Sequence, residues 1–371
     1  MKNIISDRAG LIDASGIRKV FALAAKMKDP VNFSIGQPDF DVPEPIKAAA
    51  IDAINSGNNS YSQTAGDAEL LEKLAARVTA EMGIDDPSVL VASGVSGALL
   101  LLFMATINQG DEVIMADPYF VIYKHVIRMM GGKCVFVDSY PEFKLPVEGI
   151  GAAITDRTKL IILNSPANPT GAVYSEDEIK QVADIARKHD VVVMSDEIYD
   201  TFCYDGKCPS IAAHYEKTIL LKGFSKSYGM TGWRMAYAAG SDAVADIIEQ
   251  MTKIQQYTFV CAPAPFQKAV ITALDVDMSD YVDKYRHKRD LIYDGLSRKF
   301  EINKPEGAFY AFVKAPDSAK NATEFVEKAI AHNVLIIPGN VFSERDSHFR
   351  ISYATTDDKI TQGVEILNEI A

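Results

Sequence analysis

Residues 223–234, with the sequence GFSKSYGMTGWR, place a lysine between two serines and an arginine eight positions further on. The amine of Lys226 could attack a carbonyl group as a nucleophile, and the guanidinium of Arg234 could bind a phosphate. The plain alternative is a solvated loop in which both charges face water. These twelve residues leave both interpretations open, so the choice depends on what the rest of the chain places beside them.

Polar residues follow three successive apolar runs, KLIILN, DVVVMS and TILLKG, which we interpret as buried strands. Asn168 follows the first run within SPANPTG. Asp196 and Tyr199 lie in DEIYD at the end of the second run, and Lys226 follows the third. In doubly wound sheets, ligands bind beyond the carboxyl ends of the strands. Each residue alone fits a turn, a helix start or a solvated charge, but their common sheet edge favours a binding site.

A possible anion site lies upstream, in the segment ASGVSGALLLL at 92–102. Small residues precede an apolar helix there, so the backbone N–H groups near Val95 and Ser96 should be free to bind an anion. The signal is weak by itself because such helix entries are common. The chain has neither a GxxxxGK[ST] sequence nor a GxGxxG sequence after its first strand, which disfavours a dinucleotide cofactor.

The apolar and amphipathic segments alternate as they do in α/β proteins. We expect strands at 111–117, 133–138, 159–164, 190–197, 218–223 and 234–240. Several of them are apolar throughout, which is typical of strands that are covered on both faces. The segment 175–190 has a helical period and opens with a capping-box spacing, and 98–105 reads as a buried helix. We therefore expect a three-layer α/β/α domain with a mostly parallel sheet.

The pattern changes after about residue 275. A long charged amphipathic helix at 279–300 is followed by short strands around 307–313, 334–339 and 349–354, which suggests a smaller α+β domain. We predict a large domain at 46–275 and a small domain formed by 1–45 together with 276–371. A chain of 371 residues is long enough for two domains.

Composition narrows the classes of function. The chain is 48% hydrophobic with a net charge of −12, which argues against nucleic acid or an anionic membrane as the main partner. The four cysteines lack CxxC spacing, so we expect neither a zinc site nor a disulfide framework, but reduced thiols. The N-terminal sequence has no long apolar run, so we expect no signal peptide and a cytoplasmic protein.

The sequences NPTG, SDEIYD and FSKSYGMTGWR, in this order, resemble the class I/II aminotransferases, which are pyridoxal-phosphate enzymes of fold type I. The segments SIGQPDF, GAFY, IIPG and FRISYA extend the resemblance over nearly the whole chain. Several matches at these spacings are much more specific than any single one. The resemblance implies the fold, the cofactor pyridoxal 5'-phosphate and the site residues that follow.

Three residues, Lys226, Asp196 and Tyr199, take catalytic roles by this resemblance, and Asn168 would bind both cofactor and substrate. Lys226 would form a Schiff base with the cofactor and move a proton once substrate displaces it. Asp196, buried beneath the ring, would keep the pyridine nitrogen protonated. Tyr199 and Asn168 would donate hydrogen bonds to the phenolic oxygen of the ring.

The remaining implied roles concern binding. Arg234 and Ser225 would bind the phosphate together with backbone N–H groups near Val95 and Ser96. Phe120 would stack on the ring, although an ordinary core aromatic is the alternative.

Three further residues complete the implied set. Arg350 would bind the substrate α-carboxylate as a bidentate fork, and Gly36 would allow close backbone approach beside it. Tyr61 would reach the phosphate of the neighbouring subunit in a homodimer. One departure is Gly223, where relatives often carry a serine or threonine as a further phosphate ligand.

The expected activity is a ping-pong transfer of an amino group from an L-amino acid to a 2-oxo acid such as 2-oxoglutarate. Aspartate is the first choice of donor, with aromatic amino acids or alanine left open. Aspartate needs a second cation, for which Arg18 and Lys124 are candidates, with a solvated surface charge as the alternative for each. Three alternatives stand beside this: a C–S lyase or synthase of the same fold, a cofactor-free Schiff-base lyase, and a non-catalytic regulatory binding protein.

Overall fold

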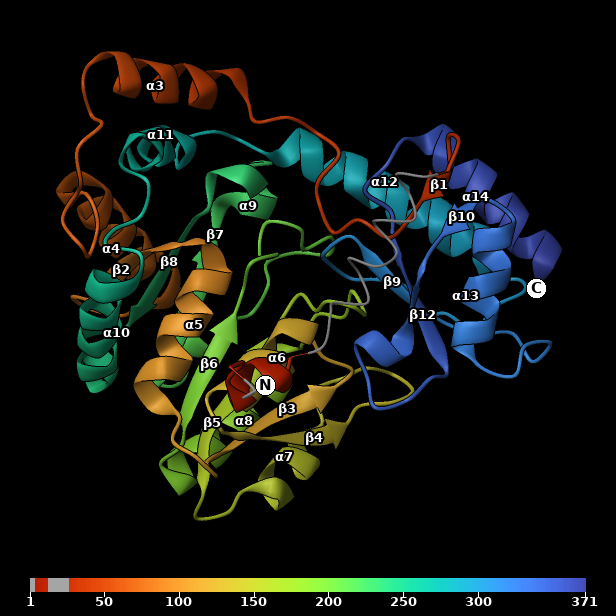
Figure 1. The fold of residues 1–371 in the computed structure, drawn as a ribbon, viewed down its shortest axis with the longest axis horizontal. Helices are drawn as coiled ribbons and strands as arrows, with labels where there is room; N and C mark the ends of the chain where they lie inside the picture. Colours follow the sequence, from red (N-terminus) through yellow and green to blue (C-terminus); the bar gives the residue numbers. More distant parts are fainter. Residues whose placement is uncertain (1–3, 13–26) are drawn as a thin grey trace.

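The computed structural model describes residues 4–12 and 27–371, and its centre is a seven-stranded sheet (Figure 1). The strand order is β2–β8–β7–β6–β5–β3–β4, and β8 runs antiparallel to both of its neighbours while the other pairs are parallel. The strands are β2 Ser88–Ser93, β3 Glu112–Asp117, β4 Lys133–Asp138, β5 Thr158–Asn164, β6 Val192–Asp196, β7 Thr218–Gly223 and β8 Met235–Gly240. The predicted α/β class with a mostly parallel sheet is confirmed.

Helices cover both faces of this sheet, which gives three layers (Figure 1). One face packs against α5 Gly94–Thr106, α6 Val121–Met129 and α10 Ala245–Thr258. The other face packs against α4 Ala68–Met82, α7 Val147–Ala153, α8 Glu176–His189 and α11 Ala264–Ala273, with α3 Glu44–Asn55 lying on α11. The part of the chain that the structure describes also has the short helices α1 Asp7–Gly10 and α9 Phe224–Ser227.

Strand β5 shows why these segments are apolar throughout. Leu160 and Ile162 pack against one helical layer, whereas Ile161 and Leu163 pack against the other. Successive side chains of a strand point to opposite faces, so a strand covered on both sides needs apolar residues at every position. The polar residue Asn164 comes where the strand leaves this double cover.

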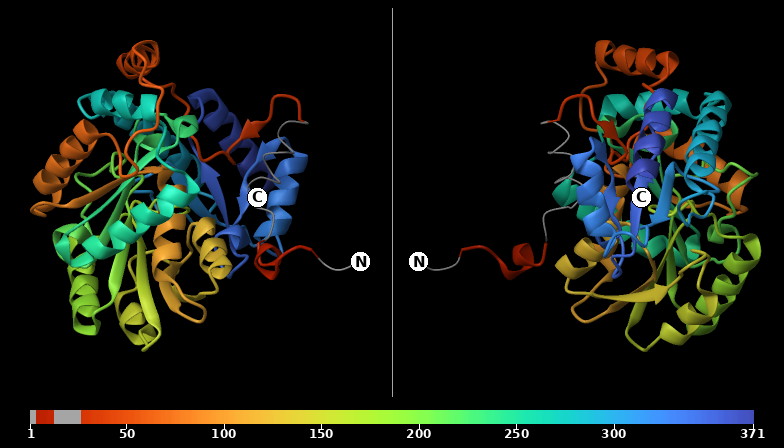
Figure 2. Two further views of the ribbon diagram at one scale, coloured as in Figure 1. Left: turned by 60° about the vertical axis from the view of Figure 1, so that its left-hand side comes forward. Right: turned by 90° about the vertical axis from the view of Figure 1, so that its right-hand side faces the viewer.

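A second group of elements, mostly drawn in teal and blue in Figures 1 and 2 but with β1 in red, lies beside the large sheet. Strand β1 Val31–Asn32 pairs in parallel with β10 Val334–Leu335, and β11 Ile337–Pro338, β12 His348–Ser352 and β9 Tyr310–Lys314 form an antiparallel sheet. The helices of this group are α12 Ser279–Leu296, α13 Ala322–Ala331 and α14 Asp357–Ile370. The pairing of β1 with β10 supports our proposal that 1–45 and 276–371 form one small domain beside a large domain at 46–275.

The structure departs from the sequence expectations in a few places. Strand β2 was not predicted, because its sequence SVLVAS runs directly into α5 and its small residues suggested only a helix entry.

The predicted capping box of α8 is present, with the Ser175 hydroxyl and the Glu178 carboxylate each bonding the other's backbone N–H. In the part of the chain that the structure describes, no helix combines the length and apolar character needed to cross a bilayer.

The expectation of reduced thiols is wrong for one pair. Cys203 and Cys208 are joined in a disulfide, and only Cys134 and Cys261 are free. A tight loop through Gly206, whose φ is +125°, turns the chain so that the two Cα atoms lie 5.8 Å apart, within disulfide range. The sequence spacing of five is not CxxC, so it gave no sign of this pairing.

Candidate active site

A cavity of about 280 Å³ lies at the carboxyl ends of β5, β6 and β7, the sheet edge where the sequence predicts a binding site. Strands β5, β6 and β7 are parallel neighbours, and their register pairs Asn164 with Asp196 and Asp196 with Leu221. The loops that follow these three strands therefore start side by side. The cavity is lined by Gly36, Val95, Ser96, Leu99, Phe120, Asn164, Asn168, Asp196, Ile198, Tyr199, Ser225, Lys226, Thr231, Arg234, Tyr310 and Arg350.

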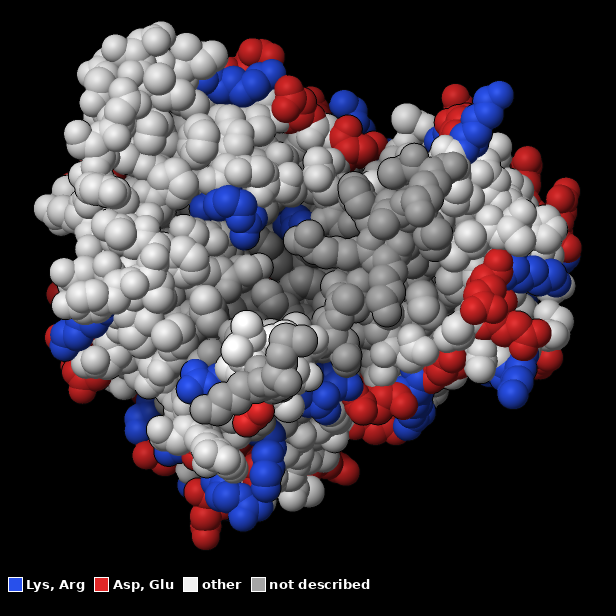
Figure 3. Space-filling view, in the orientation of Figure 1, with Lys and Arg blue, Asp and Glu red and all other residues white. Residues whose placement is uncertain are grey.

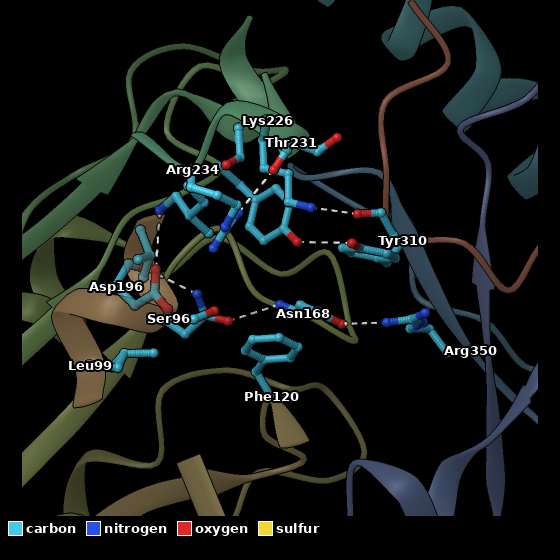
Figure 4. Close-up of a pocket in the computed structure, with 16 residues that line it drawn as sticks. Ser96, Leu99, Phe120, Asn168, Asp196, Lys226, Thr231, Arg234, Tyr310 and Arg350 are labelled. Carbon is cyan, nitrogen blue, oxygen red and sulfur yellow. Dashed lines mark hydrogen bonds between the residues drawn. The ribbon is translucent and has the colours of Figure 1, made fainter. Parts of the chain in front are cut away.

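Every site residue predicted from the sequence lines this cavity except Tyr61, as Figure 4 shows for the labelled ones. Asp196 and Arg350 lie at opposite ends of the view, with Asn168 between them. Their roles, in contrast to their positions, remain predictions.

Lys226 is half-buried, and its Nζ donates a hydrogen bond to the carbonyl oxygen of Gly36. Burial and, after it, the positive charges of Arg350 and Arg234 lower the pKa of Lys226 to about 8, while Asp196 opposes them. An amine with this pKa is partly neutral near physiological pH, and only the neutral amine is a nucleophile. The environment therefore prepares Lys226 for attack on a carbonyl group.

Asp196 is fully buried at the end of β6. Its Oδ2 accepts a hydrogen bond from the hydroxyl of Tyr123 at 2.6 Å, and its Oδ1 accepts one from the backbone N–H of Ile198 at 3.3 Å. Burial raises the pKa of Asp196 to about 6, against which the Tyr123 and Ile198 hydrogen bonds and the charge of Lys226 act. A cation bound in the cavity would favour the ionised carboxylate.

Arg350 is 1% exposed, which is rare for a guanidinium. Its Nη1 donates to Asn168 Oδ1 at 3.0 Å and its Nη2 to the carbonyl oxygen of Ser34 at 2.9 Å, but its Nε has no hydrogen-bond partner. Among the described residues no carboxylate forms an ion pair with it. A buried cation with acceptors that are all neutral is a site for an anion.

Two tyrosines meet beside these charges. The hydroxyls of Tyr199 and Tyr310 are 2.8 Å apart, and the guanidinium of Arg350 lies 4.6 Å from the Tyr310 ring centroid. Burial raises the pKa of both hydroxyls, so both stay protonated at neutral pH and can donate hydrogen bonds. Gly36 fits closely beside them, because a Cβ at this position would lie 2.6 Å from the Tyr310 hydroxyl oxygen.

The opposite part of the cavity is suited to an anion with several oxygens. Helix α5 begins at Gly94, so its first N–H groups, including those of Val95 and Ser96, have no partner within the helix. Gly94 has a φ of +70°, and a Cβ there would lie 2.2 Å from Arg234 Nη2. The guanidinium of Arg234 thus lies against the start of α5, and it also donates to the carbonyl oxygen of Thr231 at 3.0 Å.

The structure describes one of the two residues predicted as a second cation for a dicarboxylate substrate. Lys124 does not line the cavity, and its Nζ pairs with Glu344 Oε1 at 2.5 Å, so this candidate is wrong. Arg18 lies outside the described residues.

Two residues considered for the phosphate do not line the cavity. Tyr61 is 82% exposed and away from the cavity of its own chain. Gly223 does not line the cavity, and a Cβ there would meet Ile198 Cδ1 at 2.7 Å.

Some lining residues escaped the sequence analysis, namely Leu99, Asn164, Ile198, Thr231 and Tyr310. Asn164 could have been found, because it is the last residue of the apolar run KLIILN and its Nδ2 bonds the carbonyl oxygen of Asp196 at 3.0 Å. Thr231 could also have been found from its place between Lys226 and Arg234. Tyr310 ends the segment GAFY, which carries part of the resemblance, but it was given no role, and it lies in a strand of the small sheet.

The chain matches the model of a known family, described as aminotransferase class I and II, over residues 28–367. It is 39% identical to a probable aspartate aminotransferase of Methanocaldococcus jannaschii, covering 99% of this chain and 100% of that one. It is 34% identical to aromatic-amino-acid aminotransferase 2 of Thermococcus litoralis, covering 99% and 98%. Among solved structures, an aspartate aminotransferase from Thermus thermophilus with maleate superposes with a TM-score of 0.94 at 33% identity over the full length of both chains.

The sheet, the lysine beyond its edge and the buried arginine opposite define an enzyme of fold type I. The chain belongs to the class I and II aminotransferases. It is a transaminase, and the resemblance stated from its sequence is confirmed over the full chain.

Proposed function

We propose that the cavity holds pyridoxal 5'-phosphate and that the enzyme transfers an amino group from an L-amino acid to a 2-oxo acid by a ping-pong mechanism. The residues present fit the cofactor. Asp196 is a buried carboxylate whose Oδ1 accepts one long hydrogen bond, at 3.3 Å, and so has room for the N–H of a cationic ring nitrogen. The unpartnered N–H groups at the start of α5, with Arg234 and Ser225, suit a phosphate.

When bound, the cofactor would supply an electron sink for the bonds at the substrate Cα. Lys226 would hold it covalently and, when released, would take and return the proton at Cα through its Nζ. Tyr199 and Asn168 would donate hydrogen bonds at the ring hydroxyl, and Phe120 would cover one ring face. The arginine, Arg350, would hold the substrate so that Cα lies beside Lys226.

The single observation that carries this proposal is the unpaired buried cation. Arg350 has neutral hydrogen-bond partners, an Nε without any, and no described carboxylate beside it. A guanidinium binds a carboxylate through two parallel hydrogen bonds, and every α-amino acid and 2-oxo acid carries such a carboxylate. The cavity therefore fits both substrates of a transamination with one arginine.

We propose aspartate as the preferred donor and 2-oxoglutarate as the acceptor. The Methanocaldococcus and Thermus relatives are named aspartate aminotransferases, and the Thermus structure contains maleate, which supports a dicarboxylate. The aromatic-amino-acid aminotransferase of Thermococcus litoralis keeps aromatic donors as the main competing choice. With Lys124 paired to Glu344, the second carboxylate needs a cation from elsewhere, for which Arg18 remains the candidate.

Half-reactions decide both the class and the donor. The purified enzyme is loaded with pyridoxal 5'-phosphate, and single amino acids are added without an oxo acid. A transaminase shifts the cofactor absorption to shorter wavelength and releases one oxo acid per site, with aspartate reacting fastest. Multiple turnovers that release pyruvate and ammonia without this shift would support a lyase. Phenylalanine reacting faster than aspartate would make the enzyme an aromatic aminotransferase.

We further propose a homodimer in which Tyr61 reaches the phosphate held by the partner subunit. The face over α4, α5 and α10 carries few charges (Figure 3), and large apolar side chains are exposed on or beside these helices. The exposed large apolar residues of this region are Tyr61, Met104, Tyr257, Phe259 and Val260. Contiguous apolar surface of this kind usually marks an interface.

Light scattering should give twice the chain mass of 40.6 kDa. Tyr61→Phe should weaken cofactor binding, although Tyr61 touches no part of its own cavity. A monomeric enzyme with full affinity for the cofactor would exclude this arrangement.

A further inference from the structure

Tyr123 is a buried tyrosine that does not line the cavity but contacts its most buried acid. It lies on the third position of α6 and is 1% exposed. Its hydroxyl donates to Asp196 Oδ2 at 2.6 Å, although the two residues are 73 positions apart. Burial and the neighbouring Asp196 charge raise the pKa of Tyr123 well above its usual value, so the hydroxyl keeps its proton and acts as a donor.

The surroundings of Asp196 make this hydrogen bond the strongest restraint on its carboxylate. The other oxygen, Oδ1, accepts only the longer bond from the Ile198 N–H at 3.3 Å. A carboxylate oxygen can accept two hydrogen bonds, so Oδ1 keeps capacity for one more donor. Tyr123 therefore occupies one side of the carboxylate and leaves the other available to the cavity.

The ring of Tyr123 is itself held firmly. It packs in the core cluster between α6 and the sheet, and it meets the Phe120 ring edge to face, with centroids 5.7 Å apart. Phe120 lines the cavity and comes from the same segment. One rigid element thus places both an aromatic face and the hydroxyl that restrains Asp196.

We propose that Tyr123 is a positioning residue for the cofactor: its hydroxyl fixes the Asp196 carboxylate and keeps it ionised, so that the proton stays on the pyridine nitrogen. This inference rests on the proposed function. The physical reason is proton affinity. A donor to Oδ2 stabilises the negative carboxylate and makes it a weaker base. Without that donor, the carboxylate competes better with the ring nitrogen for the shared proton.

The test compares wild type with Tyr123→Phe, both loaded with pyridoxal 5'-phosphate labelled with ¹⁵N in the ring. The phenylalanine keeps the ring and its packing and removes only the hydroxyl. We expect the ¹⁵N resonance to move toward that of a neutral pyridine and the cofactor Kd to rise about tenfold, the usual order for a hydrogen bond to a charged group. We also expect kcat to fall while the KM for the amino acid changes little, because Arg350 is untouched.

Tyr215→Phe is the matched control. Tyr215 is equally buried, but its hydroxyl bonds the carbonyl oxygens of Val191 at 2.9 Å and Ala186 at 3.3 Å on the other face of the sheet. It should lose stability without moving the ¹⁵N resonance. Should Tyr123→Phe fail to fold, Tyr123→Gln supplies an amide donor in its place and should keep the resonance near that of wild type.

The outcomes separate the two proposals. If wild type does not bind pyridoxal 5'-phosphate, the proposed function is wrong. If wild type binds it and Tyr123→Phe shows the wild-type resonance and affinity, only the role of Tyr123 is wrong. A resonance that moves equally in Tyr215→Phe would also overturn the inference, because a general loss of packing would then account for it.

Discussion

Lys222, which is buried, and Lys226, which is half-buried, are four residues apart at the end of β7, yet the charges around them have opposite signs. The Nζ of Lys222 lies 2.8 Å from Glu81, 2.9 Å from Asp200 and 3.9 Å from Glu197. Burial opposes its charge, but these carboxylates prevail and hold the pKa of Lys222 well above its usual value. Lys226 has two arginines and one carboxylate around it, and its pKa falls to about 8.

Burial alone therefore does not make a lysine reactive. Desolvation acts on both amines, and the charge of the neighbours decides whether it is reinforced or reversed. The same contrast holds for the two adjacent acids at the end of β6, since Asp196 lines the cavity and Glu197 lies near Lys222. The alternation of side chains along a strand separates a structural ion cluster from a reactive site within two residues.

The largest effect is expected from removing the reactive amine. Lys226→Ala should lower transamination at least about 10³-fold, because it removes the covalent attachment and the proton carrier together. In wild type, borohydride reduction followed by peptide mapping should place the pyridoxyl group on residue 226. A pyridoxyl group on Lys222 would reverse the assignment of the two lysines.

The matching change in the other lysine should affect stability instead. Lys222→Met leaves the buried Glu197 without a cation and should lower the free energy of unfolding by about 3 kcal/mol. Glu81 and Asp200 keep partial contact with water, which limits the loss. Urea denaturation measures this, and the activity per folded molecule should stay within about threefold of wild type. A stable but inactive Lys222→Met enzyme would contradict the contrast.

Arg350 is proposed to bind the substrate carboxylate, and its charge also lowers the pKa of Lys226. Arg350→Lys keeps a positive charge but cannot make two parallel hydrogen bonds to a carboxylate, so the KM for the amino acid should rise about 30-fold. Cofactor affinity should change little, because no residue of the phosphate end is altered. Steady-state kinetics with equilibrium dialysis would show this, and an unchanged KM would remove Arg350 from the substrate site.

The smallest effect concerns pH. The neutral amine is the reactive form of Lys226, so the rate at which cofactor-free enzyme captures pyridoxal 5'-phosphate should rise about tenfold per pH unit below about 8 and level off above it. Arg350→Gln removes a positive charge that lowers this pKa, so the bend in the profile should move to higher pH. Stopped-flow absorbance measures the profile. A bend near the usual lysine pKa in wild type would show that the site does not activate the amine.

Much of this site follows from local sequence. Asn168, Asp196 and Lys226 each come just after an apolar run, and parallel strands must bring such positions to one edge. The bond between Ser175 and Glu178 at the start of α8 is likewise local. Such features depend on residues a few positions apart, so a pattern in the chain determines them.

Tertiary structure decided the contacts between distant segments. Tyr123 reaches Asp196 across 73 positions, and Arg350 reaches Ser34 across 316. The pairing of Lys124 with Glu344 removed a substrate-binding candidate that its sequence context left open. The sequence by itself determined which residues could carry the chemistry and at which edge they would meet. Packing decided their charges and partners, because desolvation and hydrogen bonding depend on everything that surrounds a group.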